Sequence, residues 1–342
     1  MEHRRLWVDY AKAIGIILVV YGHVGRGVYN AGIPINKSFF LLSDSIIYSF
    51  HMPLFFFLSG MFFCQSLLKR GPIKLLANKI DTVIYPYLLW SVIQGVVEVS
   101  LSPYTNGSVT YTDVFMLLYE PRAQFWFLYA LFMVFVVASI IYAHLSNHYI
   151  FSVFVCSSLI YLIQKDIPSP FHLNFITSNF AFFAFGVWFN RLGSLERLGS
   201  RKVFSAVLLA FILFQYVFHE LLNLTYADKG IYSFILTVIS LLFVVSLSIV
   251  FSRKPIAWIA FIGSSSMVIY LTHILVSSGS RIILQNIFDV DSASMHTIIG
   301  CLLGIAVPLV AIKYVRVINV TVLFTAPLSQ VAYDLYKSFL RR

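Results

Sequence analysis

Ten apolar segments, each near 20 residues long, run through the chain and constrain its fold more than any other feature. They cover 6–27, 40–66, 81–101, 125–144, 148–164, 174–190, 203–219, 231–251, 256–276 and 297–316. About 20 apolar residues in a helix span the hydrocarbon core of a bilayer. The segments are too long and alternate too little for the strands of a membrane barrel. Because backbone in lipid must satisfy its own hydrogen bonds, the sequence predicts an all-α polytopic membrane protein with about ten transmembrane helices.

The composition supports the same fold class. Hydrophobic residues make up 59% of the 342 residues and charged residues only 11%, and the mean hydropathy is +0.86. A soluble domain carries about 25% charged residues, so this chain lacks the polar side chains to cover a water-facing surface. Soluble enzymes, disordered chains, collagen and disulfide scaffolds are therefore excluded.

The distribution of basic residues predicts the orientation. If odd spans run outward, 17 of the 24 Lys and Arg residues fall in the cytoplasmic loops and termini, six fall in outer loops, and Lys12 lies within the first span. Because Lys and Arg collect in cytoplasmic loops, both termini are expected in the cytoplasm, and the net charge of +10 needs no nucleic acid to explain it. We expect a membrane domain over 1–318 and an amphipathic cytoplasmic tail over 319–342, interrupted by Pro327.

The first span carries two ionisable residues on one face. Lys12 and His23 are eleven residues apart, which is within about 20° of three full helical turns and about 16.5 Å along the axis. Ionisable side chains inside a span usually face a functional cavity or a partner. The alternative is a snorkelling lysine and a structural histidine at the helix end.

Further polar residues are expected at the depth of His23, in the outer half of the membrane. Asp44 and His51 are seven residues apart in the second span and would share a helix face, and His273 lies near the outer end of the ninth span. A neutral imidazole oriented by a carboxylate is a workable general base, and Asp44 is the candidate orienter. For His51 and His273 individually, a buried hydrogen-bond network between helices is an equally good explanation.

The sequence also bears on whether the protein has a metal site or a sugar-binding site. Metal binding is not expected, because the three histidines come from separate spans without HxxxH or HExxH spacing. Arg122 and Trp126 lie at the outer end of the fourth span, where an arginine beside aromatic rings suits sugar hydroxyls and where a tryptophan also fits an interfacial belt.

These residues stand in motifs that resemble the membrane acyltransferase-3 family, in particular its polysaccharide and fucose-type O-acetyltransferase branch. The resemblance rests on RLWVDYAKAIGIILVVYGHV, FHMPLFFFLSGMFF, YPYLLW, FWFLYALF and GSSSMVIYLTHIL, in this order through nearly the whole chain.

The resemblance implies a ten-helix enzyme that transfers an acyl group, usually acetyl, from cytoplasmic acyl-CoA to a hydroxyl of a glycan or lipid-linked sugar. It implies His23 as the catalytic residue, with Lys12 as its basic partner. Acyl-CoA is then a donor substrate, and no permanently bound cofactor is expected. Many members carry an RxxR pair before the YP motif, whereas this chain has ANKIDTVIYPY. Lys79 is the nearest candidate for the CoA phosphates, and three further residues are equally available: Lys69, Arg70 and Lys74.

From the residues, we expect Asp44 and His51 to assist His23, and Arg122, Trp126 and His273 to face the acceptor. The protein is expected in the inner membrane of a bacterium. Two other functions remain open. A transporter or flippase of a sugar-linked lipid would use the same ionisable residues as a proton relay, although no repeat halves or paired broken helices are evident. A non-catalytic assembly protein would explain the helices but not the shared face of Lys12 and His23.

Overall fold

The computed structural model describes residues 6–107, 109–168, 170–193, 195–317 and 321–331, and every regular element within these ranges is helical. Its helices are α1 (Leu6–Asn30), α2 (Lys37–Tyr48), α3 (His51–Met61), α4 (Phe63–Lys79), α5 (Tyr85–Ser100), α6 (Tyr111–Phe115), α7 (Trp126–Ala143), α8 (Ile150–Leu162), α9 (Asn174–Arg191), α10 (Leu195–Leu198), α11 (Arg201–Tyr216), α12 (Ile231–Ser252), α13 (Ala257–Ser264), α14 (Ser266–Asn286) and α15 (Ala293–Val317). Two π-helical turns, η1 (Ile80–Ile84) and η8 (Val217–Leu221), join α4 to α5 and extend α11.

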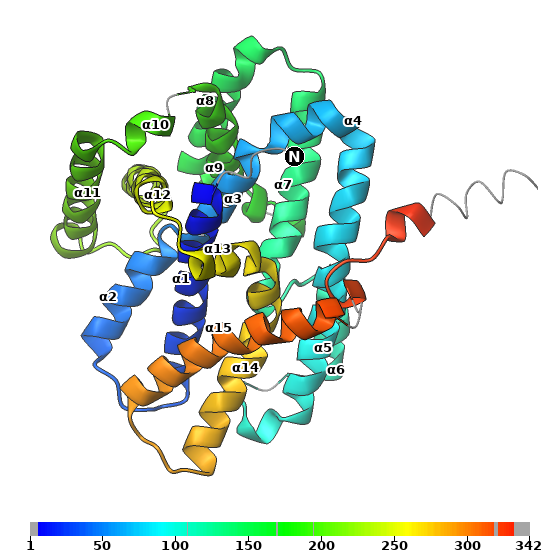
Figure 1. The fold of residues 1–342 in the computed structure, drawn as a ribbon, viewed down its shortest axis with the longest axis vertical. Coiled ribbons are helices and arrows are strands. Elements are labelled where there is room, and N and C mark those ends of the chain that lie inside the picture. The colour runs from blue at the N-terminus through cyan, green and yellow to red at the C-terminus, as the bar shows by residue number, and fades with distance from the viewer. Residues whose placement is uncertain (1–5, 108, 169, 194, 318–320, 332–342) are drawn as a thin grey trace, which may run out of the picture.

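The predicted fold class is confirmed. Eight helical segments of the described chain are long and apolar enough to cross a membrane. The two remaining predicted spans, 148–164 and 174–190, are the helices α8 and α9. The α7–α8 connection and α4 lie at one end of the molecule, and the α1–α2 and α14–α15 connections lie at the other (Figure 1). The protein is therefore an all-α, multi-pass integral membrane protein.

Helix α1 is the central element. It packs against α2, α3, α12, α13, α14 and α15, and Figure 1 shows these helices around it. In α1, 67% of the most apolar window is buried inside the protein, against 11% for the segment Arg201–Leu221. The polar residues of α1 therefore face other helices, whereas α11 is a peripheral helix whose apolar side chains suit lipid.

Glycines allow α13 to touch α1, and α3 to touch α9, through their backbones. A Cβ atom on Gly263 of α13 would lie 1.7 Å from the carbonyl oxygen of Asp9, and one on Gly60 of α3 would lie 2.0 Å from that of Phe183 in α9. Gly186 of α9 meets the carbonyl of Phe57 in the same way, at 2.0 Å. These contacts tolerate no side chain, so they fix α3 and α13 closely within the bundle.

The structure corrects three details of the predicted spans. The second span is broken between α2 and α3, where residues 49–50 leave the helix and the hydroxyl of Thr237 donates to the carbonyl of Ser49 at 2.9 Å. The ninth span is also broken, at Ser265, and α14 then continues to Asn286 rather than ending at 276. The predicted inner loop 67–80 is mostly helical, with a break at Gly71, whose φ of 71° suits glycine.

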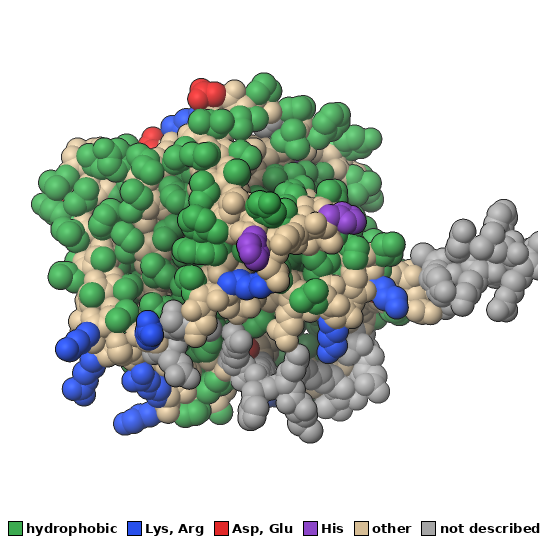
Figure 2. All heavy atoms as spheres, turned by 90° about the horizontal axis from the view of Figure 1, so that it is seen from above, with side chains coloured by type: hydrophobic (Ala, Val, Ile, Leu, Met, Phe, Trp, Pro, Cys, Tyr) green, Lys and Arg blue, Asp and Glu red, His purple; other side chains and the backbone are tan. Residues whose placement is uncertain are grey.

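The end of the molecule that carries α4 and the α7–α8 connection bears scattered Lys and Arg side chains (Figure 2). Large areas beside them are apolar in the same view. The sequence predicts that these loops are cytoplasmic, because basic residues are retained on that side of a membrane.

The tail predicted over 319–342 is described only for 321–331; residues 319–320 and 332–342 lie outside the described part. In the described piece, the indole of Trp90 donates to the carbonyl of Leu323 at 2.7 Å, and its ring stacks on Phe324. Ser329 donates from both its backbone N–H and its hydroxyl to the carboxylate of Asp81, at 2.8 and 2.6 Å. This part of the tail is therefore bound to η1 and α5.

Candidate active site

The candidate site is organised along α1, which is one unbroken helix. Because the helix is unbroken, Lys12 and His23 keep the predicted spacing. Lys12 lies toward its N-terminal end and His23 toward its C-terminal end. Lys12 lines a pocket at the end of the bundle that carries α4, and His23 lies in a cluster nearer the other end.

The three histidines predicted to share one depth do meet. The rings of His23 and His273 lie 5.3 Å apart between centroids. Tyr48 links the third histidine to them, because its ring lies 6.5 Å from that of His23 and 4.5 Å from that of His51. Gly22 makes this contact possible, since a Cβ atom there would lie 2.9 Å from the Tyr48 ring. We call these three histidines with Tyr48 the histidine cluster.

Backbone hydrogen bonds determine the tautomers of two members of the cluster. Nδ1 of His51 lies 2.8 Å from the carbonyl oxygen of Ile47, and Nδ1 of His273 lies 2.8 Å from that of Tyr270. A carbonyl oxygen only accepts, so both Nδ1 atoms carry the proton and the Nε2 atoms of the neutral rings carry a lone pair. Both rings are buried, with 1% and 0% exposure. Neutral imidazoles with a free lone pair are suited to accept a proton or a hydrogen bond from a hydroxyl.

Asp44 has a different partner from the one expected. Its carboxylate accepts two hydrogen bonds from the guanidinium of Arg26, at 2.7 and 2.8 Å. The helical wheel placed Asp44 beside His51, but the break at 49–50 separates the two residues onto different helices. Arg26 in turn lies over the ring of Tyr48, 3.3 Å from its centroid. Asp44 is therefore linked to the histidine cluster through Arg26, which lies over the ring of Tyr48.

A cavity of about 480 Å³ adjoins the cluster, with Tyr48 in its wall. We call it the outer cavity, because it lies between the N-terminal ends of α7 and α9 and the loop that follows η8. Aromatic and polar side chains line much of it: Trp126, Phe175, Asn179, Tyr226 and Lys229. Aromatic faces mixed with hydrogen-bonding groups form the kind of surface that binds sugars and similar polar ligands in pockets.

The 222–230 loop places one basic residue in this cavity. The backbone N–H of Tyr226 donates to the hydroxyl of Ser45 at 2.8 Å, which fixes the loop on α2. The ammonium of Lys229 donates to the carbonyl of Tyr226 at 2.8 Å. Burial lowers the pKa of Lys229, an effect that Asp228 opposes.

A second pocket, of about 210 Å³, lies near the other end of α1 and carries three basic residues: Lys12, Arg70 and Lys79. We call it the inner pocket. The ammonium of Lys79 lies 4.2 Å from the centre of the Phe135 ring, and Arg70 donates to the side chain of Asn78 at 2.6 Å. Lys74, which the sequence offered equally, is exposed and outside the pocket lining.

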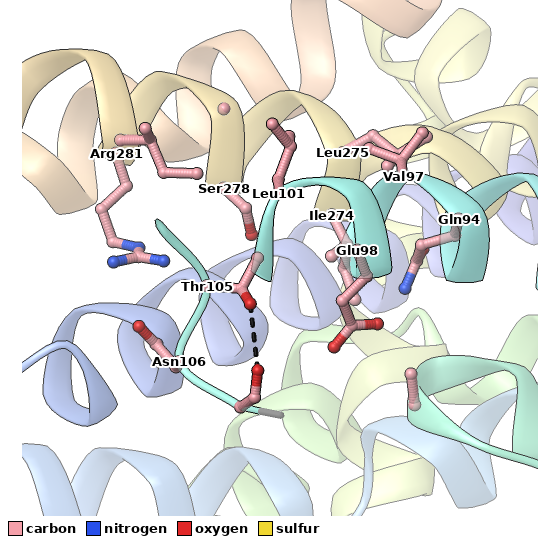
Figure 3. Close-up of a pocket in the computed structure, with 14 residues that line it drawn as sticks. Gln94, Val97, Glu98, Leu101, Thr105, Asn106, Ile274, Leu275, Ser278 and Arg281 are labelled. Carbon is pink, nitrogen blue, oxygen red and sulfur yellow. Dashed lines mark hydrogen bonds between the residues drawn. The ribbon is translucent and has the colours of Figure 1, made fainter. Parts of the chain in front are cut away.

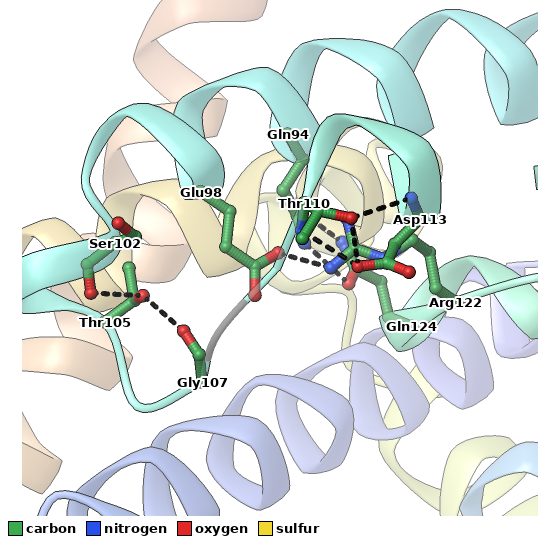
Figure 4. Close-up of polar contacts among 9 residues, drawn as sticks. All are labelled: Gln94, Glu98, Ser102, Thr105, Gly107, Thr110, Asp113, Arg122 and Gln124. Carbon is green, nitrogen blue, oxygen red and sulfur yellow. Dashed lines mark hydrogen bonds and ion pairs between the residues drawn. The ribbon is translucent and has the colours of Figure 1, made fainter. Parts of the chain in front are cut away.

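The three predicted acceptor residues lie in three different environments. Trp126 lines the outer cavity, whereas Arg122 forms an ion pair with Glu98 at 2.9 Å. Figure 4 shows this pair beside the paired amides of Gln94 and Gln124. His273 belongs to the histidine cluster. Arg122 therefore joins α5 to the start of α7.

Sequence reasoning missed Arg26 and Tyr48, although both contact the predicted residues. Arg26 follows His23 by three residues on the same helix, so the spacing in GHVGRG was the available signal. Tyr48 carried no such signal, because its position depends on the break between α2 and α3. Among the described residues, no group of three or more His, Cys, Asp or Glu side chains could hold a metal ion.

Fold and site together define a class: a multi-pass helical membrane protein in which one central helix connects a basic pocket near one end to a histidine cluster and a polar-aromatic cavity nearer the other. The chain belongs to the family of the acyltransferase domain, whose sequence profile matches residues 5–313.

Two curated relatives are similar over part of the chain. Nodulation protein NolL of Mesorhizobium japonicum is 28% identical over 143 residues, which are 41% of this chain and 36% of that protein. Nodulation protein NolL of Sinorhizobium fredii is 28% identical over 131 residues, which are 38% of this chain and 34% of that protein. The matched segment thus spans about a third of the length of these relatives. No solved structure shows significant similarity to the chain.

Proposed function

We propose that this protein is an integral-membrane O-acyltransferase of a bacterial inner membrane. It transfers an acetyl or similar acyl group from cytoplasmic acyl-CoA to a hydroxyl of a cell-surface glycan or lipid-linked sugar. The observation that carries the proposal is the arrangement along α1, where Lys12 lines a basic pocket and the half-buried ring of His23 lies beside the buried ring of His273. Family membership supports the reaction class.

On the donor side, the inner pocket suits a polyanion. Acyl-CoA carries several phosphate groups, and Lys and Arg side chains bind phosphates through charge-assisted hydrogen bonds. With the phosphates near Lys79 and Arg70, the pantetheine arm would extend along α1 past Lys12. The axial separation of about 16.5 Å between Lys12 and His23 is comparable to the reach of that arm.

On the acceptor side, the outer cavity is lined by Trp126, Tyr226 and Lys229. Aromatic rings pack against the apolar faces of sugars, and the polar groups orient their hydroxyls. Tyr48 forms part of the wall and also contacts the ring of His51. A hydroxyl that enters from this cavity therefore approaches the histidine cluster.

In the proposed reaction, His23 accepts the proton of the acceptor hydroxyl as its oxygen attacks the thioester carbon. The new C–O bond forms as the C–S bond breaks, and the CoA thiolate leaves. The thiolate then takes the proton from His23, which regenerates the neutral imidazole. A positioned general base typically contributes about 10²- to 10⁴-fold in rate. Transfer through an acetyl-histidine is the alternative mechanism, and a burst of CoA release ahead of acylated product would identify it.

The test is acyl transfer from labelled acetyl-CoA into surface glycan, in membranes that contain equal amounts of wild type, His23→Ala or His144→Ala. His144 is the matched control, since it ends the α7 helix at the connection to α8, away from the cluster. We expect label with wild type and His144→Ala and almost none with His23→Ala. Equal incorporation by all three proteins would remove His23 from the mechanism. If wild type moves a sugar-linked lipid across vesicles without consuming acetyl-CoA, the protein is a transporter instead.

A further inference from the structure

A third cavity lies between α5, α14 and the 105–107 loop, and it contains a buried arginine. Its volume is about 230 Å³. Figure 3 shows the guanidinium of Arg281 pointing into it. The predicted ninth span ends at residue 276 and leaves Arg281 outside it, but the residue belongs to α14 and is only 8% exposed.

Within the described residues, Arg281 makes no ion pair or hydrogen bond, and its Nε atom is buried without a partner. Glu98 is the carboxylate that lines the cavity, and it is paired with Arg122 at 2.9 Å. A snorkelling arginine would extend its guanidinium into water, which the low exposure contradicts. A buried charge without a counterion is costly, so a buried arginine of this kind points to a binding site for an anion.

The remaining walls indicate what carries the anion. Val97, Leu101, Ile274, Leu275 and Ile282 make most of the lining apolar. Val97 and Leu101 are also 36% and 40% exposed on the surface of the bundle. In a membrane protein this surface faces lipid tails, so an apolar chain can enter the cavity from the bilayer. The guanidinium fork matches the geometry of a phosphate group.

The cavity also leads toward the histidine cluster. Ile274 and Arg281 are seven residues apart on α14, which places them on one face with a separation of about 10.5 Å along the axis. Ile274 directly follows His273. At this inner end, Ala123 lines both this cavity and the outer cavity, so the two spaces adjoin beside the cluster.

We propose that the Arg281 cavity binds the phosphate of a lipid-linked sugar, so that the acceptor of the proposed acyl transfer is a sugar carried on a lipid phosphate. The inference rests on the proposed function and narrows its acceptor class. Arg281 binds the phosphate, the apolar walls hold the first part of the lipid chain, and the sugar extends toward the outer cavity.

Binding is tested first, without reference to activity. The probe is dodecyl phosphate added to the solubilised full-length protein, with dodecanol as the uncharged control. We expect Arg281→Gln to raise the Kd of dodecyl phosphate by about 10-fold or more, and Arg281→Lys to give an intermediate value because it keeps the charge but loses the fork. Lys37→Gln, at an exposed outer cation, should leave the Kd unchanged. Equal Kd values for wild type and Arg281→Gln would overturn the proposal.

Stability provides a second readout, which guards against a misfolded variant. Since the charge of Arg281 is buried and unpaired, Arg281→Gln should unfold at a temperature equal to or above that of wild type in the absence of the probe. Dodecyl phosphate should raise the Tm of wild type and leave that of Arg281→Gln unchanged. A fall in Tm for the variant without the probe would indicate that Arg281 is a structural residue.

The acceptor role is tested with one sugar in two synthetic forms, a dodecyl phosphate ester and a dodecyl glycoside without phosphate. Arg281→Gln should raise KM for the phosphate form by about 10-fold or more and leave KM for the glycoside unchanged. An equal effect on both forms would overturn the assignment. So would phosphatidylglycerol that binds as tightly as dodecyl phosphate without competing with the acceptor, since this would identify a resident bilayer lipid. If wild type transfers no acyl group to either form, the proposed function fails, while the binding data still decide whether the cavity takes a phosphate.

Discussion

The inner pocket and the surroundings of the histidine cluster differ in whether carboxylates accompany their basic residues. The inner pocket gathers Lys12, Arg70 and Lys79 without a carboxylate in its lining. Around the outer cluster, by contrast, Arg26 is paired with Asp44 and Arg122 with Glu98. A group of cations in one pocket suits the binding of an anion, whereas cations paired with carboxylates hold side chains in place. We infer that the inner pocket binds an anion by charge and that the paired cations beside the histidine cluster hold its side chains in place. Arg281, which has no such partner among the described residues, belongs to the separate cavity proposed above to bind a phosphate.

Among the variants that test this comparison, the largest effect should come from the inner pocket. Lys79→Met removes a cation that can form charge-assisted hydrogen bonds with CoA phosphates, worth about 1.5–3 kcal/mol each. We expect KM for acetyl-CoA to rise by about 10- to 100-fold with little change in kcat. Lys74→Met is the matched control, because Lys74 is exposed and outside the pocket. Steady-state kinetics at saturating acceptor provide the measurement, and equal KM values for the two variants would remove the contrast between pocket and surface.

A smaller effect should follow from the outer pair. Asp44→Asn leaves the Arg26 guanidinium without its carboxylate. Removing one partner of a buried ion pair lowers the free energy of unfolding by about 3–5 kcal/mol. Because the Arg26 and Asp44 side chains are 31% and 11% exposed, we expect a smaller loss of stability, about 1–2 kcal/mol. Because Arg26 lies over the Tyr48 ring of the histidine cluster, the same change should disturb the position of the cluster, and we expect about a 10-fold fall in kcat with an unchanged KM for acetyl-CoA.

Arg26→Gln and the double variant complete a thermodynamic cycle for this pair. If the pair acts as a positioning unit, the double variant is no worse than either single variant. Additive losses would show that the two residues act independently. A rise in the acetyl-CoA KM of Asp44→Asn would contradict the separation of donor binding from positioning.

The smallest effect concerns the pH dependence of stability at the outer cavity. Burial lowers the folded-state pKa of Lys229 below its ordinary value of 10.5. Between these two values the unfolded chain binds more protons than the folded one, so this residue makes stability rise with pH in that window. Lys229→Met should reduce the gain in Tm of the solubilised protein as pH approaches 10.5. Parallel Tm profiles for the two proteins would show that the ammonium is not desolvated.

The sequence was sufficient where a helix continues and insufficient where one breaks. Lys12 and His23 could be related by spacing alone, because α1 has no interruption. Asp44 and His51 could not, since the break at residues 49–50 changes the angle between them, and the contact that stabilises it comes from Thr237, far along the chain. Arg281 was left outside the ninth span because hydropathy counts a charged residue as polar and carries no information on its burial against a neighbouring helix.

Ala123 has a consequence for how acceptor preference can change. Among the described residues, it alone lines both the outer cavity and the Arg281 cavity, and its backbone has a φ of 49°. A larger side chain there would reduce the space where the two cavities adjoin, whereas glycine would enlarge it and suit this φ. In the proposed reaction, substitution of Ala123 would therefore change which acceptors fit the two cavities without altering the three histidines or the inner pocket.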